Sequence, residues 1–403
     1  MSAAVFDKKE LERRANHTSE PPRRPRVLHL INSFEIGGTE RQAVELLKRL
    51  DDERFDVRLA ALRNIGPFYA EIEDRFPRVP EFPLTSFYDL NAARQLARLR
   101  ALMTRERIDI LHAHDFYSGF IGAVAAHLSG ARVIACQRHL KLSDRAVHEW
   151  GTRVIHRLAH RILVNSEAIR DHILSRSSAH AKKIIVIKNG VSQPANSGRI
   201  LRDSLCREIG AESDSKLIGM IARLQPVKGH KFFIEAAARV ITREPKAIFV
   251  IVGDGPLKSE IEEQAARLCI KERLRMLGDR TDVSRIVASL DLLVLASLHE
   301  GLPNAVMEAM SAGVPVVATS VGGTKELITE GETGYLIPPA DAQALADRMT
   351  FALLNEADRM RLAASARQFI SAEFGMRRMV ESVEKLYGEL MGSPEGATPL
   401  ASF

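Results

Sequence analysis

The sequence predicts an α/β protein built of two Rossmann-like, doubly wound units that face each other across a cleft. The chain has 403 residues, which is more than one domain of about 100–200 residues usually contains. Short apolar runs alternate with helix-length amphipathic segments along most of the chain, as in proteins with parallel sheets. The polar stretch GVSQPANSGR (190–199) interrupts this alternation, which then starts again. It is therefore predicted to link the two units.

The first unit is predicted to span residues 25–195. Its apolar runs are VLHLI (27–31), VRLAAL (57–62), IDILHAH (108–114), RVIACQ (132–137), RILVNS (161–166) and KIIVIKN (183–189). Continuous apolar runs between helices are typical of parallel strands that are covered on both faces. Residues 1–24 lack apolar periodicity and are predicted to form a disordered basic tail.

The second unit is predicted to span residues 196–375. Its apolar runs are KLIGMIAR (216–223), AIFVIVG (247–253), RLRMLG (273–278), LDLLVLAS (290–297), VPVVAT (314–319) and GYLIP (334–338). The amphipathic segment 376–391 follows and is predicted to be a helix that packs back on the first unit. Open parallel sheets bind ligands at the carboxyl ends of their strands, so the motifs at strand ends are the candidate site.

Composition narrows the class of protein. Apolar residues make up 45% and charged residues 27%, and no apolar run reaches the roughly 18 residues needed to span a bilayer. The first residues have no apolar core of the kind that a secretory signal carries. The three cysteines (Cys136, Cys206 and Cys269) are far apart in the sequence, which is typical of free thiols in a reducing compartment. We therefore expect a cytoplasmic protein.

Basic charge is concentrated in the first unit. Residues 1–195 contain 32 Lys and Arg against 23 Asp and Glu, whereas the remainder contains 25 against 28. This asymmetry predicts attraction to something anionic: a membrane face, such as the inner face of the plasma membrane, a phosphorylated ligand or nucleic acid. Residues 94–109 either form a basic amphipathic helix that contacts lipid or have a solvated helix face. No nucleic-acid partner is expected, because no nucleic-acid module is recognisable and aromatic residues make up only 5%.

The motif NSFEIGGTERQ follows the first predicted strand. Gly37 and Gly38 allow a ligand to approach the backbone closely, and Thr39 with Gln42 fits a capping box at the start of the next helix. A helix N-terminus behind two glycines predicts an anion site. The alternative is a tight turn with no ligand.

The motif HAHD (112–115) ends a predicted strand. His112 and His114 lie on the same side of that strand. Two histidines at this spacing can bind zinc, but Phe116 and Tyr117 stand where a longer metal-binding series would need Asp and His. No metal is therefore expected. His114 is predicted to hydrogen-bond a sugar or phosphate, and His112 is interpreted as a core histidine.

Basic residues follow two other strands. Arg223 and Lys228 occur in RLQPVKG, where both side chains can reach one phosphate and Gly229 eases its approach. Arg138 and His139 follow the strand RVIACQ and are expected to face the cleft, without an assigned role.

The stretch EGLPNAVMEAM contains two glutamates, Glu300 and Glu308, on either side of a predicted helix start near Pro303. The amides at that helix start attract an anion. Two carboxylates that bind hydroxyls, with an anion site between them, fit a sugar nucleotide. One alternative is the acid pair of a glycoside hydrolase, with carboxyl groups about 5–9 Å apart, and another is a pair of helix-surface charges.

Together these motifs resemble the retaining glycosyltransferases of family 4, also called group 1, which have the GT-B fold. The resemblance covers residues 26–391. It rests on GGTE, HAHD, NGV (189–191), RLQPVKG, VGDGP, LGDRTDV (277–283), EGLPNAVMEAMSAGVPVVAT, GGTKELI (322–328) and GETGYLI (331–337). The block with the two glutamates is the most specific of these motifs.

The resemblance implies roles for individual residues. In the reaction, His114 would line the reaction centre, Glu300 would contact the donor sugar, and Arg223 with Lys228 would hold the diphosphate. The residues implied in binding the nucleotide sugar are Gly38, Gly278, Arg280, Gly301, Leu302 and Glu308. Among these, Gly38 would meet a phosphate, Glu308 the ribose, and the loop of Gly278 and Arg280 would border the base.

The resemblance also implies a reaction. A sugar would pass from a UDP- or GDP-linked donor to a glycan or lipid-linked acceptor, with retention at the anomeric carbon, in the synthesis of cell-surface polysaccharide or glycolipid. The chain contains no Asp-x-Asp triplet, so metal-independent transfer without any cofactor beyond the donor is expected. The alternatives are a sugar-nucleotide 2-epimerase of the same architecture and a non-catalytic sugar-nucleotide-binding protein.

Overall fold

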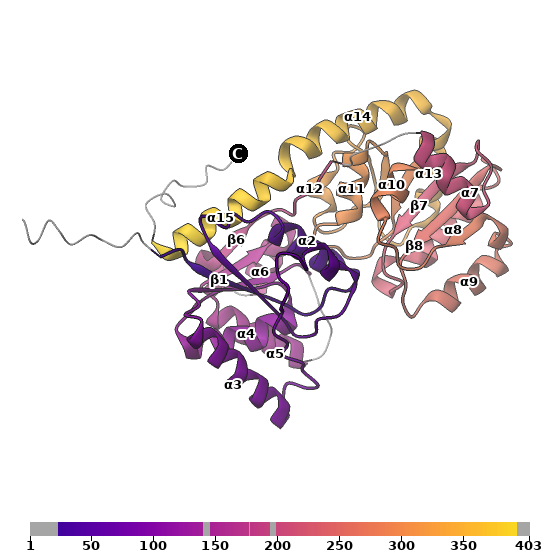
Figure 1. Ribbon diagram of the computed structural model, residues 1–403. Helices are drawn as coiled ribbons and strands as arrows, with labels where there is room; N and C mark the ends of the chain where they lie inside the picture. Colours follow the sequence, from indigo (N-terminus) through magenta and orange to yellow (C-terminus); the bar gives the residue numbers. More distant parts are fainter. Residues whose placement is uncertain (1–22, 140–145, 177, 194–198, 393–403) are drawn as a thin grey trace, which may run out of the picture.

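The computed structural model describes residues 23–139, 146–176, 178–193 and 199–392. These residues form two α/β units, each built on one parallel sheet (Figure 1). The predicted basic tail lies outside the described residues except for its last two positions, and so does the middle of the predicted linker.

The N-terminal unit contains the six strands that the apolar runs predicted. Their order across the sheet is β2-β1-β3-β4-β5-β6, and all five neighbouring pairs are parallel. In chain order its strands and α-helices are β1 (Arg26–Ile31), α2 (Gly38–Leu47), β2 (Asp56–Ala61), α3 (Leu90–Arg105), β3 (Ile110–Ala113), α4 (Phe116–Ser129), β4 (Arg132–Gln137), α5 (Ala146–Leu158), β5 (Arg161–Val164), α6 (Glu167–Arg176) and β6 (Ile184–Val186).

The C-terminal unit also has six parallel strands, in the order β12-β11-β10-β7-β8-β9. Its strands and α-helices are α7 (Arg199–Ile209), β7 (Lys216–Ile221), α8 (His230–Val240), β8 (Ala247–Val252), α9 (Lys258–Arg267), β9 (Leu274–Met276), α10 (Val283–Ala288), β10 (Leu292–Leu295), α11 (Asn304–Ala312), β11 (Val316–Thr319), α12 (Thr324–Leu327), β12 (Tyr335–Ile337), α13 (Ala342–Leu354) and α14 (Glu356–Glu373). Every residue of β8 is buried, because helices cover both faces of the sheet.

The last helix, α15 (Met376–Met391), leaves the C-terminal unit and lies along the N-terminal one (Figure 1). Its buried side chains recur every three or four residues, which places them on one face. That face packs against Val27, Ile110 and Ile134 of the first sheet. The sheet of the N-terminal unit is therefore covered in part by a helix that follows the second unit in sequence.

One of two predicted helix starts differs from the observed one, while α11 does start near Pro303. The Thr39–Gln42 capping box is wrong, because α2 begins at Gly38 with Gly37 as its N-cap and no side-chain cap. The Gln42 side chain instead exchanges two hydrogen bonds, of 2.9 and 3.0 Å, with the backbone of Gly190. Helix α11 begins at Asn304, with Pro303 as its N-cap. Among the described residues, no helix is both long enough and apolar enough to cross a membrane.

Candidate active site

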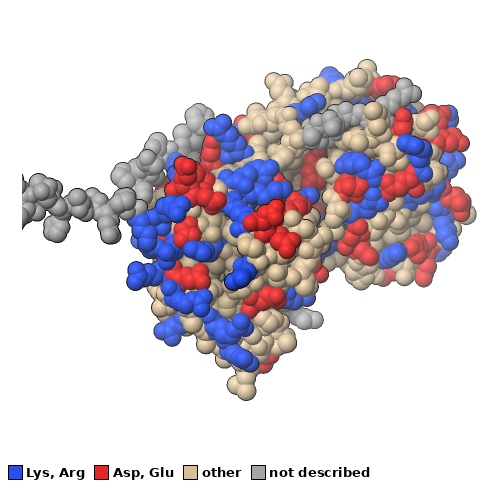
Figure 2. Space-filling model, viewed as in Figure 1, with Lys and Arg blue, Asp and Glu red and all other residues tan. Residues whose placement is uncertain are grey.

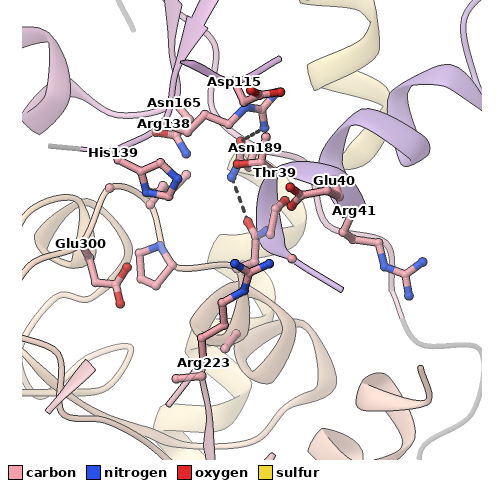
Figure 3. Close-up of a pocket in the computed structure, with 18 of the residues that line it drawn as sticks. Thr39, Glu40, Arg41, Asp115, Arg138, His139, Asn165, Asn189, Arg223 and Glu300 are labelled. Atoms are coloured by element: carbon pink, nitrogen blue, oxygen red, sulfur yellow. Dashed lines mark hydrogen bonds between the residues drawn. The ribbon is translucent and has the colours of Figure 1, made fainter. Parts of the chain in front are cut away.

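The two units enclose a cleft of about 800 Å³, which is lined from the N-terminal unit by the loop before α2, the end of β3 and the end of β4. From the C-terminal unit it is lined by the segments after β7 and β10 and the start of α11. Figure 3 shows side chains from both units around this space. The carboxyl ends of both sheets thus meet at one site, as the fold prediction required.

Glu300 lies in the loop after β10 and is held by two neighbours. Its Oε1 accepts a hydrogen bond of 2.6 Å from Ser297 Oγ and forms an ion pair of 2.7 Å with Lys228 Nζ. The residue is only 9% exposed. Because the carboxylate has two fixed partners, its position is set before any ligand arrives.

Arg223 reaches across the cleft from the end of β7 (Figure 3). Its Nη2 donates a hydrogen bond of 2.9 Å to the carbonyl oxygen of Ile36, in the loop before α2. A Cβ at Gly37 would lie 3.1 Å from that same nitrogen, so this glycine leaves space for the guanidinium. Arg223 and Lys228 therefore line one cleft, but here they have different partners rather than one common partner.

A line of hydrogen bonds connects the two units beside Arg223. Arg138 Nη1 donates to Asn189 Oδ1 at 3.0 Å, and Asn189 Nδ2 donates to Asn304 Oδ1 at 2.8 Å (Figure 3). Asn304 Nδ2 then donates to the carbonyl oxygen of Gly38 at 3.0 Å. Gly38 thus lies at the start of α11, with its backbone against the residue that begins that helix.

The N-termini of α2 and α11 both line the cleft. Neither helix has a side-chain cap. In α11 the first turn therefore presents the backbone N–H groups of residues 304–306, since the N-cap Pro303 has none. Two uncapped helix starts give the cleft partial positive charge in addition to the charges of its Arg and Lys side chains.

Glu308 lines the cleft from the second turn of α11. Burial raises its pKa from 4.5 to about 7, an effect that Arg41 opposes and Glu45 reinforces. A carboxyl group with this pKa is partly protonated near neutral pH, so it can both donate and accept hydrogen bonds there.

This pKa predicts how stability depends on pH. Between pH 4.5 and 7 the folded protein keeps a proton on Glu308 that the unfolded chain has lost, so the free energy of unfolding falls as pH rises through this range. Relative to Glu308→Gln, which cannot ionise, the wild type should lose up to about 3 kcal/mol between pH 5 and 8. Urea unfolding of both proteins across this range measures the difference. A difference that stays constant with pH would contradict the raised pKa.

The HAHD motif contributes to the site and to the core. His112 is fully buried, as interpreted, and contacts Tyr387 and Cys136. His114 is also buried but lines the cleft. Asp115 has a structural role, because it accepts hydrogen bonds from the amides of Ser118 and Tyr117 and caps α4.

His29, His112 and His114 form a cluster whose ring nitrogens lie within 4.8 Å of one another, close enough in distance for a metal site. The rings of His112 and His114 are stacked, however, with centroids 4.4 Å apart and an interplanar angle of 16°. A histidine binds metal through a lone pair in the plane of its ring, and the lone pairs of two nearly parallel rings do not converge well. The ring geometry therefore disfavours a shared ion.

The remaining predicted residues have different surroundings. Arg280 and Leu302 line the cleft, and Arg280 is paired with Glu208 and Asp282. Gly301 also lines it, and a Cβ there would lie 2.4 Å from the Arg138 carbonyl oxygen. Gly278 is not among the lining residues, so its predicted place beside a bound base is not supported. It forms a turn with φ +66° after the short strand β9, and its carbonyl accepts from Gly253.

Arg138 and His139 line the cleft, as their strand-end position predicted. Cleft residues that were not predicted include Glu40, Asn189 and Asn304, although the quoted motifs contained them. Burial raises the pKa of Glu40, and the charge of Asp115 adds to this. Strand-end position does not reveal the contact of Arg138 with Asn189, because that contact joins distant segments.

Two family models match the chain in succession. Residues 36–193 match "Glycosyltransferase Family 4", and residues 202–369 match "Glycosyl transferases group 1". The chain belongs to this glycosyltransferase family. The resemblance inferred from the motifs is thereby confirmed.

Curated relatives of this glycosyltransferase carry related descriptions. It is 27% identical over 372 residues to the UDP-Gal:alpha-D-GlcNAc-diphosphoundecaprenol alpha-1,3-galactosyltransferase of Escherichia coli, covering 88% of this chain and 95% of that protein. It is 26% identical over 377 residues to the N-acetyl-alpha-D-glucosaminyl L-malate synthase of Bacillus anthracis, with the same coverage of 88% and 95%.

Solved structures confirm the predicted fold. Anabaena HepE in complex with UDP and glucose superposes with a TM-score of 0.81 at 23% identity, covering 90% of this chain and 99% of that one. WaaG, a glycosyltransferase involved in lipopolysaccharide biosynthesis, gives a TM-score of 0.72 at 16% identity, covering 89% and 99%. The glycosyltransferase therefore has the GT-B fold.

Proposed function

We propose that this glycosyltransferase moves a sugar from a nucleoside-diphosphate sugar to a hydroxyl of a glycan or lipid-linked acceptor, with retention at the anomeric carbon. The observation that carries the proposal is the start of α11. Its uncapped amides lie between two cleft carboxyl groups, Glu300 before the helix and Glu308 within it. Under this proposal Glu300 binds the sugar, the amides bind the diphosphate, and Glu308 binds the ribose.

A uridine donor is the first to test. The E. coli relative is described as using UDP-Gal, and HepE was solved with UDP and glucose. The same relative acts on a diphosphoundecaprenol-linked sugar, which favours a lipid-linked acceptor and a place in cell-surface polysaccharide or glycolipid synthesis. GDP-sugars are the second donor class.

We further propose that transfer needs no metal. Negative charge develops on the leaving diphosphate, and the cleft supplies Arg223, Lys228 and the α11 amides to stabilise it. Lys228 would exchange its contact with Glu300 for the diphosphate, which leaves Glu300 free to accept from sugar hydroxyls. The acceptor hydroxyl would attack from the face that the diphosphate leaves, and the departing phosphate oxygen would take its proton.

The test is to incubate the purified protein with a panel of UDP- and GDP-sugars and to measure nucleotide release with and without sugar-diphosphate lipid acceptors. We expect nucleotide release that depends on the acceptor and is not diminished by EDTA. The new glycosidic bond should have the same anomeric configuration as the sugar had in the donor. Release of nucleotide with an epimerised free sugar would indicate the epimerase. Binding of the nucleotide without any release would indicate a non-catalytic protein.

Arg223→Ala should weaken UDP binding about tenfold or more, because a charge-assisted hydrogen bond to phosphate contributes about 1.5–3 kcal/mol. Calorimetric titration with UDP and with uridine separates the cause. UDP affinity should fall while uridine affinity stays the same. A matched loss for uridine would mean that the substitution disturbs the cleft rather than a phosphate contact. Arg267→Ala, on α9, is the control.

We also propose that the N-terminal unit docks on the anionic cytoplasmic face of a membrane. Large apolar side chains are exposed around α3 and α5, namely Tyr88 (67%), Leu90 (90%), Val147 (41%) and Trp150 (52%). Arg94 and Arg98 of α3 are exposed beside them, and Figure 2 shows many Lys and Arg side chains on this unit. Apolar side chains among basic ones suit the interface of an anionic bilayer.

Vesicle co-sedimentation tests this docking. The protein should bind vesicles that contain phosphatidylglycerol, release with salt, and bind less after Leu90→Ser with Trp150→Ser. Ile200→Ser removes a side chain that is equally exposed (84%) on the C-terminal unit and should have no effect. Equal binding by all three proteins would refute this surface as the docking site.

A further inference from the structure

Beneath the cleft, five side chains form an unbroken line of hydrogen bonds. His114 Nε2 lies 2.9 Å from His29 Nδ1, and His29 Nε2 lies 3.2 Å from Tyr387 Oη. Tyr387 Oη also lies 2.6 Å from His112 Nδ1, and His112 Nε2 lies 3.1 Å from Cys136 Sγ. We call this set the histidine chain. Its two ends, His114 and Cys136, both line the cleft.

The histidine chain joins distant parts of the sequence. Its histidines come from β1 and from the end of β3, and Cys136 comes from β4. Tyr387 comes from α15, the helix that follows the C-terminal unit. Tyr387 is fully buried and contacts two histidines through one hydroxyl, so within the described part of the protein this oxygen joins the two halves of the histidine chain by hydrogen bonds.

The three histidines are neutral, because burial lowers each pKa, that of His29 to about 3. A neutral histidine has one N–H and one lone pair. In a line of such groups, the direction of one hydrogen bond fixes the direction of the next. Only two arrangements of the hydrogen atoms therefore satisfy every bond in the line. In one, Cys136 donates first and His114 is left with its proton on Nδ1. In the other, His114 donates from Nε2 and its Nδ1 carries a lone pair.

Arg138 favours the first arrangement. Its positive charge acts on Cys136, where it opposes the burial that raises the thiol pKa. In the second arrangement the His112 N–H would be directed at the sulfur beside this charge, which also acts on His112. In the first arrangement the thiol hydrogen is directed at His112 and the sulfur lone pairs remain for the positive charge, which is the electrostatically better arrangement.

His114 Nδ1 is the free end of the histidine chain. It is buried and has no hydrogen-bond partner among the described residues, while His114 lines the cleft. Leaving such a group unpaired is costly, so a ligand atom is the natural partner. Its tautomer decides whether that ligand atom must accept or donate.

We propose that Tyr387 is a positioning residue that holds His114 in the Nδ1–H tautomer, so that His114 offers a hydrogen-bond donor to the bound substrate. That the substrate is a nucleotide sugar rests on the function proposed above. The tautomer itself does not, and it can be observed in the protein without any substrate.

The tautomer is measured by long-range ¹H–¹⁵N correlation in protein with ¹⁵N-labelled histidine, in which the His114 signals are those lost in His114→Gln. We expect a proton on Nδ1 in the wild type. Tyr387→Phe removes the linking hydroxyl and should shift the tautomer ratio of His114 about tenfold toward Nε2–H, the factor that about 1.4 kcal/mol produces. Tyr335→Phe is the matched control, since it removes another buried tyrosine's hydroxyl, bonded to Asp358 in the C-terminal unit.

Cys136 provides a second test that leaves α15 intact. Cys136→Ala removes the first donor and should shift His114 in the same direction, whereas Cys136→Ser keeps a donor and should restore the wild-type spectrum. His114 signals that are unchanged in both Tyr387→Phe and Cys136→Ala would overturn the proposal, and so would an Nε2–H tautomer in the wild type. A stoichiometric metal whose removal shifts all three histidines would overturn it as well. Nucleotide release assays play no part in these outcomes, so failure of the proposed function would be seen separately.

Discussion

Glu300→Gln is expected to lower the rate of sugar transfer by about 10²–10³-fold at saturating donor, the usual effect of removing one preorganised polar group at a reacting centre. UDP should still bind, and should bind as tightly as before or more tightly. The reason is the ion pair with Lys228 at 2.7 Å. Loss of the carboxylate charge frees this lysine for the diphosphate.

Paired measurements of UDP affinity and of turnover at saturating donor check this expectation. Glu262→Gln, which changes an exposed glutamate of α9, is the control and should leave both unchanged. Lost UDP binding with intact turnover would show that Glu300 contacts the nucleotide instead of the sugar. Ser297→Ala removes the other partner of the carboxylate and should cause a smaller loss of rate in the same direction.

Gly322→Ala should produce the second large effect, in which stability and activity fall together. Gly322 has φ +49°, and a Cβ there would lie 1.9 Å from the carbonyl oxygen of Glu300. The added atom cannot be accommodated unless the Glu300 loop moves. We expect the free energy of unfolding to fall by about 3 kcal/mol or more and transfer to fall at least tenfold.

Gly331→Ala separates the effect of backbone strain from that of a steric clash. Gly331 also has a positive φ, of +73°, but no atom lies within 4 Å of the position of an added Cβ. The Gly331→Ala substitution should therefore lower the free energy of unfolding only by the backbone strain of about 1–2 kcal/mol, and it should leave turnover unchanged. Chemical unfolding and transfer rates of the two variants give the comparison. If both variants lose the same stability and activity, the contact with the Glu300 loop is not what matters at Gly322.

The strands and their order of appearance could be predicted because each is a local pattern. All twelve apolar runs became strands, since continuous apolar segments between helices have few stable alternatives to a buried parallel sheet. The same reasoning placed His114, Arg223, Lys228, Glu300 and Glu308 at one site. Each lies at or just after a strand's carboxyl end or in the helix that follows, and those ends share one edge of the sheet.

The partners of these residues could not be predicted, because they depend on contacts between distant segments. Nothing in the sequence indicated that Arg223 bonds the carbonyl oxygen of Ile36 or that Lys228 pairs with Glu300. Gln42 was interpreted as part of a helix cap, and its side chain instead meets Gly190, 148 positions away. Local rules for caps and loops carry no information about such approaches.

By itself, the sequence determined the two α/β units and the strand ends on which the cleft residues lie, because apolar periodicity and glycine-rich turns act over a few neighbouring residues. Its motifs carried the resemblance to the family. The sequence also predicted that α15 packs back on the first unit, but only the tertiary structure decided which contacts it makes there, with Tyr387 against His29 and His112. Sequence spacing cannot show this, since Tyr387 and His29 are 358 positions apart. Their hydrogen bond depends on how the whole amphipathic helix packs on the N-terminal unit.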